Sequence, residues 1–526
     1  MGHNPPVGSG IFHISLFDKI FKRWRNRFIQ GAIFQELGNK MRVMLLNPPY
    51  ISTSKYGKPP LFAMAIPLGI GYIGAVLKKG GFDVRVKDMY FMSWKECEGA
   101  IREYGPSIVG ISCLTEQRMS AFKLADIVKK IDKDIMVVVG GHHASYMYRQ
   151  VLEKYESVDI VVIGEGEETM IEIVSRLKKK NHKLDGIKGI AYRKGGKIIF
   201  NGCREPIKDL DTVPFPLYDE YDLDVYREHE NFKNITIGGK KIKDMKSATI
   251  ITSRGCPFKC QFCSSSVFWG RRWRFRSAEN VLDEIELLNK RYKVTHFNIE
   301  DDAFTIDKKR TKEICEGMIK RRLKVAWTCT TRITSLSSDL VKIMKDSGCY
   351  LVAVGVESGS QKILDSIHKS LSVKDIISGF EMLRKAKMMS TALLMVGNPG
   401  EDEGTVNETV DLIKKIRPFR LGLSITMVFP ETELYQIAKK KGLLRDDYWL
   451  SELPPPYYTP ENSIKQLKKW WNKIFYAWCI SRGEYGLLLK RLVNSEIISA
   501  RDFIEVVTGY KISRRGFEKV PKMVGA

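Results

Sequence analysis

From residue 41 onward, short strand-like runs alternate with longer segments in which apolar residues recur at helical spacing. Short apolar runs that are separated by helices are typical of strands in a parallel sheet. Helical spacing is clearest in Leu68–Lys79 and Ala121–Ile131. Residues 41–184 are therefore predicted to form an α/β domain whose open, doubly wound sheet carries helices on both faces. The predicted strands of this domain are Val43–Leu46, Asp83–Lys87, Ile108–Ser112, Met136–Val139 and Ile160–Ile163.

A second series of the same kind occupies residues 246–445. It predicts a partial (β/α)6 barrel, whose ligands bind at the carboxyl ends of the strands. The segment between the two series, residues 185–245, is predicted to be a connector because Val213-Pro214-Phe215-Pro216 suits neither a helix nor a central strand. Residues 446–526 are predicted to be a basic helical tail that runs to the end. The predicted barrel strands are Ala248–Thr252, His296–Glu300, Val325–Thr330, Leu351–Val356, Thr391–Val396 and Leu423–Val428.

Residues 1–40 are predicted to be an extension outside both domains. Within it, Leu16–Phe34 places apolar and aromatic residues at helical spacing among five basic residues. This pattern is typical of an amphipathic helix that lies on an anionic membrane. In the alternative interpretation the protein starts at Met41, which directly precedes the first buried strand.

Composition excludes several classes of protein. The chain has 526 residues, of which 44% are hydrophobic and 28% charged, as in an ordinary globular protein. Its formal net charge of +25 is spread along the sequence without a nucleic-acid-binding motif, so no nucleic-acid partner is expected. The charge suits an anionic membrane, an acidic ligand or simply a solvated basic surface.

Cysteine usage and hydropathy together predict the compartment. Ten cysteines lack the regular pairing of a disulfide framework, and no apolar stretch is long enough for a membrane span or a signal peptide. We therefore expect a cytoplasmic protein. The basic N-terminus adds the hypothesis of a peripheral position on the inner membrane face.

The candidate metal ligands are Cys256, Cys260 and Cys263, spaced Cys-x3-Cys-x2-Cys directly after the first barrel strand. Three thiolates on one loop suit three corners of a four-iron cluster and leave one iron open. The alternative is structural zinc, which wants four ligands. Other cysteines and histidines lie well outside the loop, although the fold could bring one of them back.

With this loop, the chain resembles the radical S-adenosylmethionine superfamily, whose members cleave S-adenosylmethionine reductively to a 5′-deoxyadenosyl radical. The resemblance covers about residues 246–435. It implies that Phe262 packs on the adenine, that an acidic residue after the second strand holds the amino group, and that Arg332 reaches the carboxylate. For Arg332 a surface ion pair is the alternative. The remaining residues that the resemblance implies as contacts are Glu300, Asp301, Asp302, Glu357, Ser358, Gly397 and Pro430.

The first domain resembles the Rossmann-like, cobalamin-binding class of this superfamily. The resemblance rests on glycine-rich strand ends, and it implies that backbone at these ends approaches a large flat ligand. The Asp-x-His-x-x-Gly motif of cobalamin mutases is absent, so no histidine from that motif would bind cobalt. In an alternative reading the domain keeps the fold without cobalamin. The implied cobalamin contacts are Ser112, Gly140, Gly141 and Gly164.

The combination implies a cobalamin-dependent methyltransferase that acts on an unactivated carbon. A radical cyclase of the anaerobic porphyrin-ester type has the same architecture, and a cobalamin sensor is the alternative outside enzymes. The complete cysteine triad argues against a sensor. Expected cofactors are a 4Fe-4S cluster, S-adenosyl-L-methionine and cobalamin. Expected partners are a small-molecule or lipid substrate and a reductant such as flavodoxin or ferredoxin.

Overall fold

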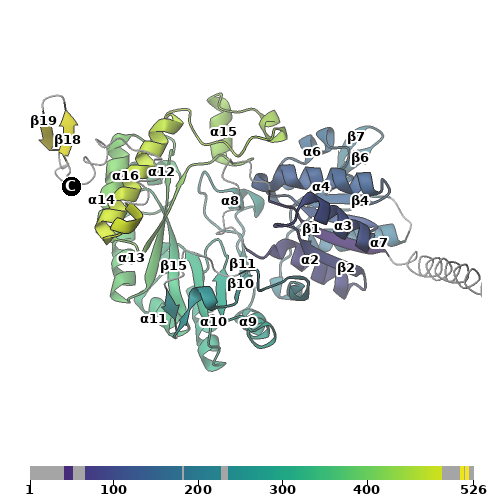
Figure 1. Cartoon of the computed structure of the whole chain (residues 1–526), viewed down its shortest axis with the longest axis horizontal. Coiled ribbons are helices and arrows are strands. Elements are labelled where there is room, and N and C mark those ends of the chain that lie inside the picture. Colours follow the sequence, from purple (N-terminus) through teal and green to yellow (C-terminus); the bar gives the residue numbers. More distant parts are fainter. Residues whose placement is uncertain are drawn as a thin grey trace, which may run out of the picture.

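The computed structural model describes two α/β bodies that lie side by side (Figure 1). The structure describes residues 41–50, 65–179, 183–226, 235–237 and 239–488, and the backbone of residues 510–513 and 516–519. The predicted N-terminal helix lies outside these residues. Among the described helices, none has the length and apolar character needed to cross a membrane.

The first body is built on a seven-stranded sheet in the order β2-β1-β3-β4-β5-β6-β7. Strands β1 to β5 pair in parallel, as predicted, and helices lie between them in sequence. The parallel strands are β1 (Arg42–Asn47), β2 (Asp83–Asp88), β3 (Ile108–Ser112), β4 (Met136–Gly140) and β5 (Ile160–Val162). The helices are α2 (Leu68–Lys79), α3 (Trp94–Tyr104), α4 (Arg118–Ile131), α5 (His142–Tyr146), α6 (Tyr148–Lys154) and α7 (Glu167–Lys178).

The first sheet continues past the predicted domain end at residue 184. Strands β6 (Ile190–Lys194) and β7 (Lys197–Phe200) add to it in antiparallel fashion next to β5. The predicted connector therefore begins with two strands of the first sheet. A hairpin can extend a sheet without a crossover helix, which is why the alternating strand–helix pattern does not reveal it.

The second body is the partial barrel, a six-stranded parallel sheet in the order β10-β13-β14-β15-β16-β17. All six predicted strands are present. The strands are β10 (Ser247–Ile250), β13 (His296–Ile299), β14 (Ala326–Thr331), β15 (Cys349–Glu357), β16 (Met389–Val396) and β17 (Arg420–Ile425). The helices are α8 (Ser264–Phe268), α9 (Ala278–Tyr292), α10 (Lys308–Lys320), α11 (Ser338–Asp346), α12 (Gln361–Ser366), α13 (Val373–Lys385), α14 (Glu403–Ile416) and α15 (Glu433–Lys440).

The C-terminal region is only partly the predicted helical tail. Helix α16 (Ile464–Arg482) packs against α14 and β17. Near the end of the chain, β18 (Tyr510–Ser513) and β19 (Gly516–Lys519) pair as an antiparallel hairpin. The prediction of a helix that runs to the end is therefore wrong for these residues. Apolar and charged residues alternate on both sides of Arg514-Arg515-Gly516, and this pattern suits a hairpin better than a helix.

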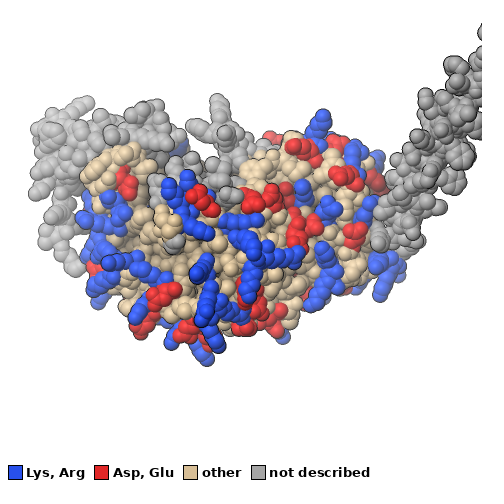
Figure 2. All heavy atoms as spheres, turned by 60° about the horizontal axis from the view of Figure 1, so that its bottom comes forward, with Lys and Arg blue, Asp and Glu red and all other residues tan. Residues whose placement is uncertain are grey.

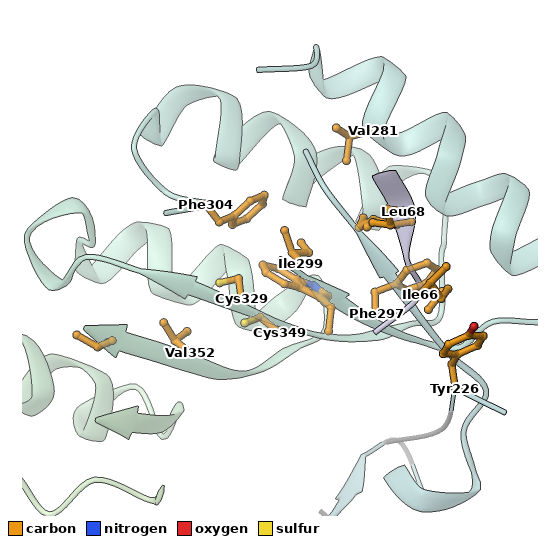
Figure 3. Packing of buried hydrophobic residues seen from close by; sticks show 14 of the residues in the cluster. Ile66, Leu68, Tyr226, Val281, Phe297, Ile299, Phe304, Cys329, Cys349 and Val352 are labelled. Atoms are coloured by element: carbon orange, nitrogen blue, oxygen red, sulfur yellow. The ribbon is translucent and has the colours of Figure 1, made fainter. Parts of the chain in front are cut away.

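One hydrophobic core crosses the boundary between the bodies. Ile66, Leu68 and Tyr226 lie beside the barrel residues Val281 and Phe297 in the same buried cluster (Figure 3). A second cluster joins the other face of the first sheet to the segment after β17. Four shorter strands complete the described elements: β8 (Thr236–Ile237), β9 (Lys240–Lys241), β11 (Ser253–Arg254) and β12 (Arg274–Phe275).

The connector packs as part of this core. Tyr218 and Tyr221 are buried, and each hydroxyl is satisfied. Tyr218 donates to Glu284 of α9 at 2.8 Å, and Tyr221 donates to the Pro67 carbonyl at 3.0 Å. Because these contacts reach both bodies, the connector fixes how the two sheets face each other.

Candidate active site between the two sheets

The loop that carries the three cysteines has a rigid stem. Backbone N–H groups and hydroxyls of Thr252 and Ser253 donate four hydrogen bonds to the buried Asp301 carboxylate, at 2.6 to 3.1 Å. Gly255 follows with φ +89°, and a Cβ there would lie 2.1 Å from the Arg272 carbonyl oxygen. Only glycine fits this position, so backbone geometry places Cys256.

The three cysteines are half-buried and lie close together. Burial raises the pKa of the Cys256 thiol to about 11, and the neighbouring Cys263 and Cys260 add to that rise. Burial likewise raises the pKa of Cys263. Within the described residues, no group of His, Cys, Asp or Glu side chains is arranged as a closed metal site. The loop thus offers three thiols and no fourth protein ligand.

Arg332 is buried beside this loop rather than in a surface ion pair. Its guanidinium donates to the carbonyls of Lys369 and Ser370 at 2.6 and 2.8 Å. It also lies 3.7 Å from the centroid of the Phe258 ring. Burial lowers the pKa of Arg332, while the nearby Cys260 opposes that shift. The structure therefore places a cation next to the cluster loop, where an anionic carboxylate would be attracted.

The three acidic residues after β13 divide between two roles. Asp301 is fully occupied by the loop stem, so the structure does not leave it for a ligand. Glu300 and Asp302 instead line the cavity described below. Asp302 accepts a hydrogen bond from Ser265 of α8, and burial raises the pKa of its carboxyl group.

At the end of β15 the predicted ribose contacts also separate. Glu357 adopts φ +66° at a register shift between β15 and β16 and pairs with Lys369 at 2.7 Å. Ser358 is fully buried, with its hydroxyl 3.3 Å from that of Thr409 on α14. The Gly359 N–H donates to the same Thr409 hydroxyl at 2.9 Å. Glu357 thus remains a candidate contact, whereas Ser358 anchors the loop to α14.

The two late turns are packed against the C-terminal region. Gly397 has φ +92° and donates its N–H to Glu401, and a Cβ there would lie 3.0 Å from Leu467 of α16. Pro430 is buried. Phe262 is half-buried against the core cluster on the second face of the first sheet. The predicted contacts of these residues with S-adenosylmethionine, including the adenine contact of Phe262, therefore stay predictions.

A cavity of about 600 Å³ separates the carboxyl ends of the two sheets. From the first body, the predicted residues Ser112, Gly140, Gly141 and Gly164 all line it. A Cβ at Gly164 would meet no atom within 4 Å, so this glycine borders open space. The barrel contributes Arg254, Gly255, Ser264, Ser265, Phe268, Trp269, Glu300 and Asp302. The cavity therefore joins the glycine-rich strand ends to the cluster loop.

Known proteins combine these same two parts. The sequence pattern of the B12 binding domain matches residues 63–174, and that of the radical SAM superfamily matches residues 250–413. An uncharacterized methyltransferase of Pyrococcus horikoshii is 30% identical over 437 residues, which cover 82% of this chain and 91% of that protein. An anaerobic magnesium-protoporphyrin IX monomethyl ester cyclase of Rubrivivax gelatinosus is 30% identical over 404 residues, or 75% of this chain and 70% of that protein.

The chain belongs to the cobalamin-binding radical S-adenosylmethionine family. Solved structures share the fold. The methyltransferase TsrM from Kitasatospora setae superposes with a TM-score of 0.62 at 20% identity, over 77% of this chain and 76% of that chain. The cobalamin-dependent radical enzyme OxsB superposes with a TM-score of 0.66 at 18% identity, over 89% and 70%.

Its cofactors are a [4Fe-4S] cluster, S-adenosylmethionine and cobalamin, and the site fits each of them. Three thiols on one loop, with no fourth ligand from the part of the chain that the structure describes, suit a cluster with one open iron. Arg332 and Glu357 place a cation and a carboxylate near that loop. The glycine-lined floor of the cavity lets backbone approach a flat macrocycle closely.

An aromatic wall of the cobalamin cavity was not predicted from sequence. The His142 ring packs against that of Phe268 of α8, with centroids 3.9 Å apart and planes tilted by 31°, and Trp269 lies edge-on to both rings. Burial lowers the pKa of His142 to about 4, so the imidazole is neutral near pH 7. His143 is not among the residues that line the cavity, and its Nδ1 lies 3.3 Å from the Thr115 hydroxyl. Phe268 and Trp269 belong to no motif in the sequence, and only the fold brings them to His142, which follows the Gly140-Gly141 turn.

Proposed function

We propose that this enzyme transfers a methyl group from S-adenosylmethionine to an unactivated carbon. The shared cavity carries the proposal, because the cobalamin-binding strand ends and the cluster loop line the same space. A carbon radical formed beside the cluster would therefore arise within reach of cobalamin. When bound, the cluster supplies the electron that cleaves S-adenosylmethionine, and cobalamin carries the methyl group.

The protein's own residues position and shield the reactants. Arg332 and Glu357 would hold the carboxylate and ribose of S-adenosylmethionine, while Gly140, Gly141 and Gly164 would support the corrin. The closely packed rings of His142 and Phe268 form a wall of the cavity that would shield a reactive carbon radical from water. We assign no side chain as an acid or base, since the hydrogen leaves the substrate as an atom.

The proposed reaction balances with two molecules of S-adenosylmethionine and two electrons. One molecule gives up its methyl group and leaves as S-adenosylhomocysteine. The other is cleaved to methionine and a 5′-deoxyadenosyl group, which takes the hydrogen atom from the substrate carbon. The two electrons enter one at a time, and we propose a flavodoxin or ferredoxin as their source.

Coverage of the relatives supports methylation over cyclisation. The match extends over 91% of the Pyrococcus methyltransferase but over 70% of the Rubrivivax cyclase. A cytidylyl-2-hydroxyethylphosphonate methyltransferase of Streptomyces wedmorensis and a hopanoid C-3 methylase of Methylococcus capsulatus match at 28% and 23% identity. These substrates differ widely, so our proposal extends only to a small molecule or lipid with an unreactive C–H bond.

Product analysis of the loaded enzyme tests the proposal. The anaerobic protein, carrying cluster and cobalamin, is reduced and given S-adenosylmethionine with a trideuterated methyl group, together with metabolite and lipid extracts. Methylation predicts S-adenosylhomocysteine and 5′-deoxyadenosine in equal amounts and a product heavier by a trideuterated methyl group. Substrate-dependent 5′-deoxyadenosine without S-adenosylhomocysteine would contradict methylation and favour the cyclase.

A further inference from the structure

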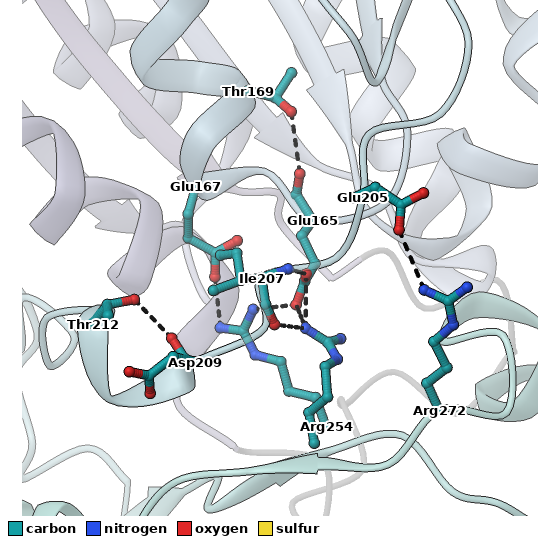
Figure 4. Close-up of polar contacts among 10 residues, drawn as sticks. Glu165, Glu167, Thr169, Glu205, Ile207, Asp209, Thr212, Arg254 and Arg272 are labelled. Atoms are coloured by element: carbon teal, nitrogen blue, oxygen red, sulfur yellow. Dashed lines mark hydrogen bonds and ion pairs between the residues drawn. The ribbon is translucent and has the colours of Figure 1, made fainter.

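A buried cluster of ion pairs joins the two bodies immediately before the cysteine loop. Arg254 donates to Glu165 and to Glu167, each at 2.6 Å (Figure 4). Arg274 donates to both oxygens of Glu165 at 3.0 Å. Glu165 also accepts from the Ile207 N–H at 2.7 Å. The two glutamates follow β5 of the first body, whereas both arginines belong to the barrel.

The four charged side chains of this group are almost completely buried. Side-chain exposure is 10% for Arg254, 8% for Glu165, 7% for Glu167 and 11% for Arg274. Two positive and two negative charges balance, so none is left uncompensated away from water. Arg254 also lies over the rings of Tyr72 and Trp269, at 5.4 and 5.9 Å from their centroids. Two carboxylates and two aromatic rings therefore restrict the orientation of this guanidinium.

This group of ion pairs borders both cofactor sites. Glu165 and Glu167 flank Gly166 and follow Gly164, and all four residues line the cobalamin cavity. Arg254 is separated from Cys256 only by Gly255. The other side of the same stem is held by Asp301 of the barrel. The residues before Cys256 are thus held by hydrogen bonds to the barrel and by ion pairs to the cobalamin domain.

Other contacts already hold the two bodies together. A hydrophobic core crosses the boundary, and buried Arg118 of α4 donates to the carbonyls of Trp449 and Ser451 at 3.0 and 2.8 Å. The ion cluster is therefore not required for association. Its place beside Cys256 gives it a different role.

We propose that Arg254, with Glu165 and Glu167, is a positioning unit that fixes the cluster loop relative to the bound cobalamin. Their effect on the reaction passes through the loop stem, which continues from Arg254 through Gly255 into Cys256. The inference rests on the family's cofactors and holds whether the reaction is methylation or cyclisation.

The magnetic interaction between the two cofactors measures this position directly. The full-length enzyme is loaded with cluster and cobalamin and reduced, so that the cluster and cob(II)alamin each carry one unpaired spin. Electron paramagnetic resonance then reports their coupling, which depends steeply on distance and orientation. We expect a resolved splitting in the unaltered enzyme. The double variant Glu165→Gln/Glu167→Gln should lose it while retaining iron, sulfide and cobalt.

Matched variants make the result decisive. Glu172 lies on helix α7, as Glu167 does. The substitution Glu172→Gln removes an ion pair with Arg204 that does not border the cavity. It should leave the splitting unchanged. Arg254→Lys keeps the charge but loses the fork that bridges two carboxylates, and it should alter the splitting even if the double variant does not fold. The same splitting in a fully loaded Arg254→Lys or double variant, or an equal change in Glu172→Gln, would overturn the proposal.

Discussion

At the scale of single residues, side chains adjacent in sequence have quite different functions. Asp301 is buried under four hydrogen bonds, while its neighbour Asp302 faces the cavity. Glu357 is paired with Lys369, while Ser358 points into the core. Function at this scale therefore depends on which neighbour a side chain meets, and substitutions must be chosen position by position.

Replacing Cys256, Cys260 and Cys263 together with Ala should abolish both the cluster and 5′-deoxyadenosine formation, because no other described residue completes the site. Iron and sulfide assays, absorption spectra and chromatography of the nucleoside check this. Cys203→Ala is the control, since Cys203 is an exposed thiol outside the loop. Continued 5′-deoxyadenosine release by the triple variant would disprove the central assignment.

Glu357→Ala should weaken S-adenosylmethionine binding tenfold or more, with an unchanged cluster spectrum. Hydrogen bonds to a charged group contribute about 1.5–3 kcal/mol each. Anaerobic calorimetry measures the change. Lys369→Met breaks the same 2.7 Å ion pair but keeps the carboxylate, so it should weaken binding less. Equal losses in both variants would assign Glu357 to the ion pair instead of the ligand.

At the scale of elements, glycines mark where backbone segments meet. Gly359 is such a position, because its backbone closely approaches α14. A Cβ at Gly359 would lie 2.4 Å from the Thr409 Cα. The loop after β15 is therefore locked onto α14, and this contact holds Glu357 at its place.

Gly359→Ala should destabilise the protein by about 1–3 kcal/mol, because the methyl group meets backbone that cannot rotate away. Urea unfolding measures the free energy. Gly99→Ala is the matched control: its Cβ would meet nothing within 4 Å, and it lies inside helix α3. Alanine there should stabilise by roughly 0.5–1 kcal/mol. Equal effects of the two substitutions would contradict the packing argument.

At the scale of the whole molecule, the basic surface and the shared core are the main features. Figure 2 shows Lys and Arg across the middle of one face, with Asp and Glu among them. The formal net charge of +25 is thus not a single patch on this face. Such a mixed surface by itself does not select a macromolecular partner, so the terminal segments remain the basis for the membrane hypothesis.

The two terminal segments are predicted to bind anionic vesicles loosely. They are residues 1–40 and residues 464–526, and the second carries 13 Lys or Arg against 5 Asp or Glu. Each basic residue near such a surface contributes up to about 1 kcal/mol at low salt. Vesicle flotation should show binding that needs anionic lipid, weakens with salt and falls when residues 1–40 are removed. Equal binding to neutral vesicles, or none to either, would leave the charge as ordinary surface.

The sequence by itself determined the two strand–helix series, the cysteine loop and the glycine-rich strand ends, because each is a local spacing that backbone geometry translates directly. Tertiary structure alone decided the pairing of Arg254 with Glu165 and Glu167, the capture of Asp301 by the loop stem and the aromatic wall at His142. It also decided that β6 and β7 belong to the first sheet. These depend on segments far apart in sequence, whose partners are selected only in the folded chain, where an unpaired buried charge or donor is costly.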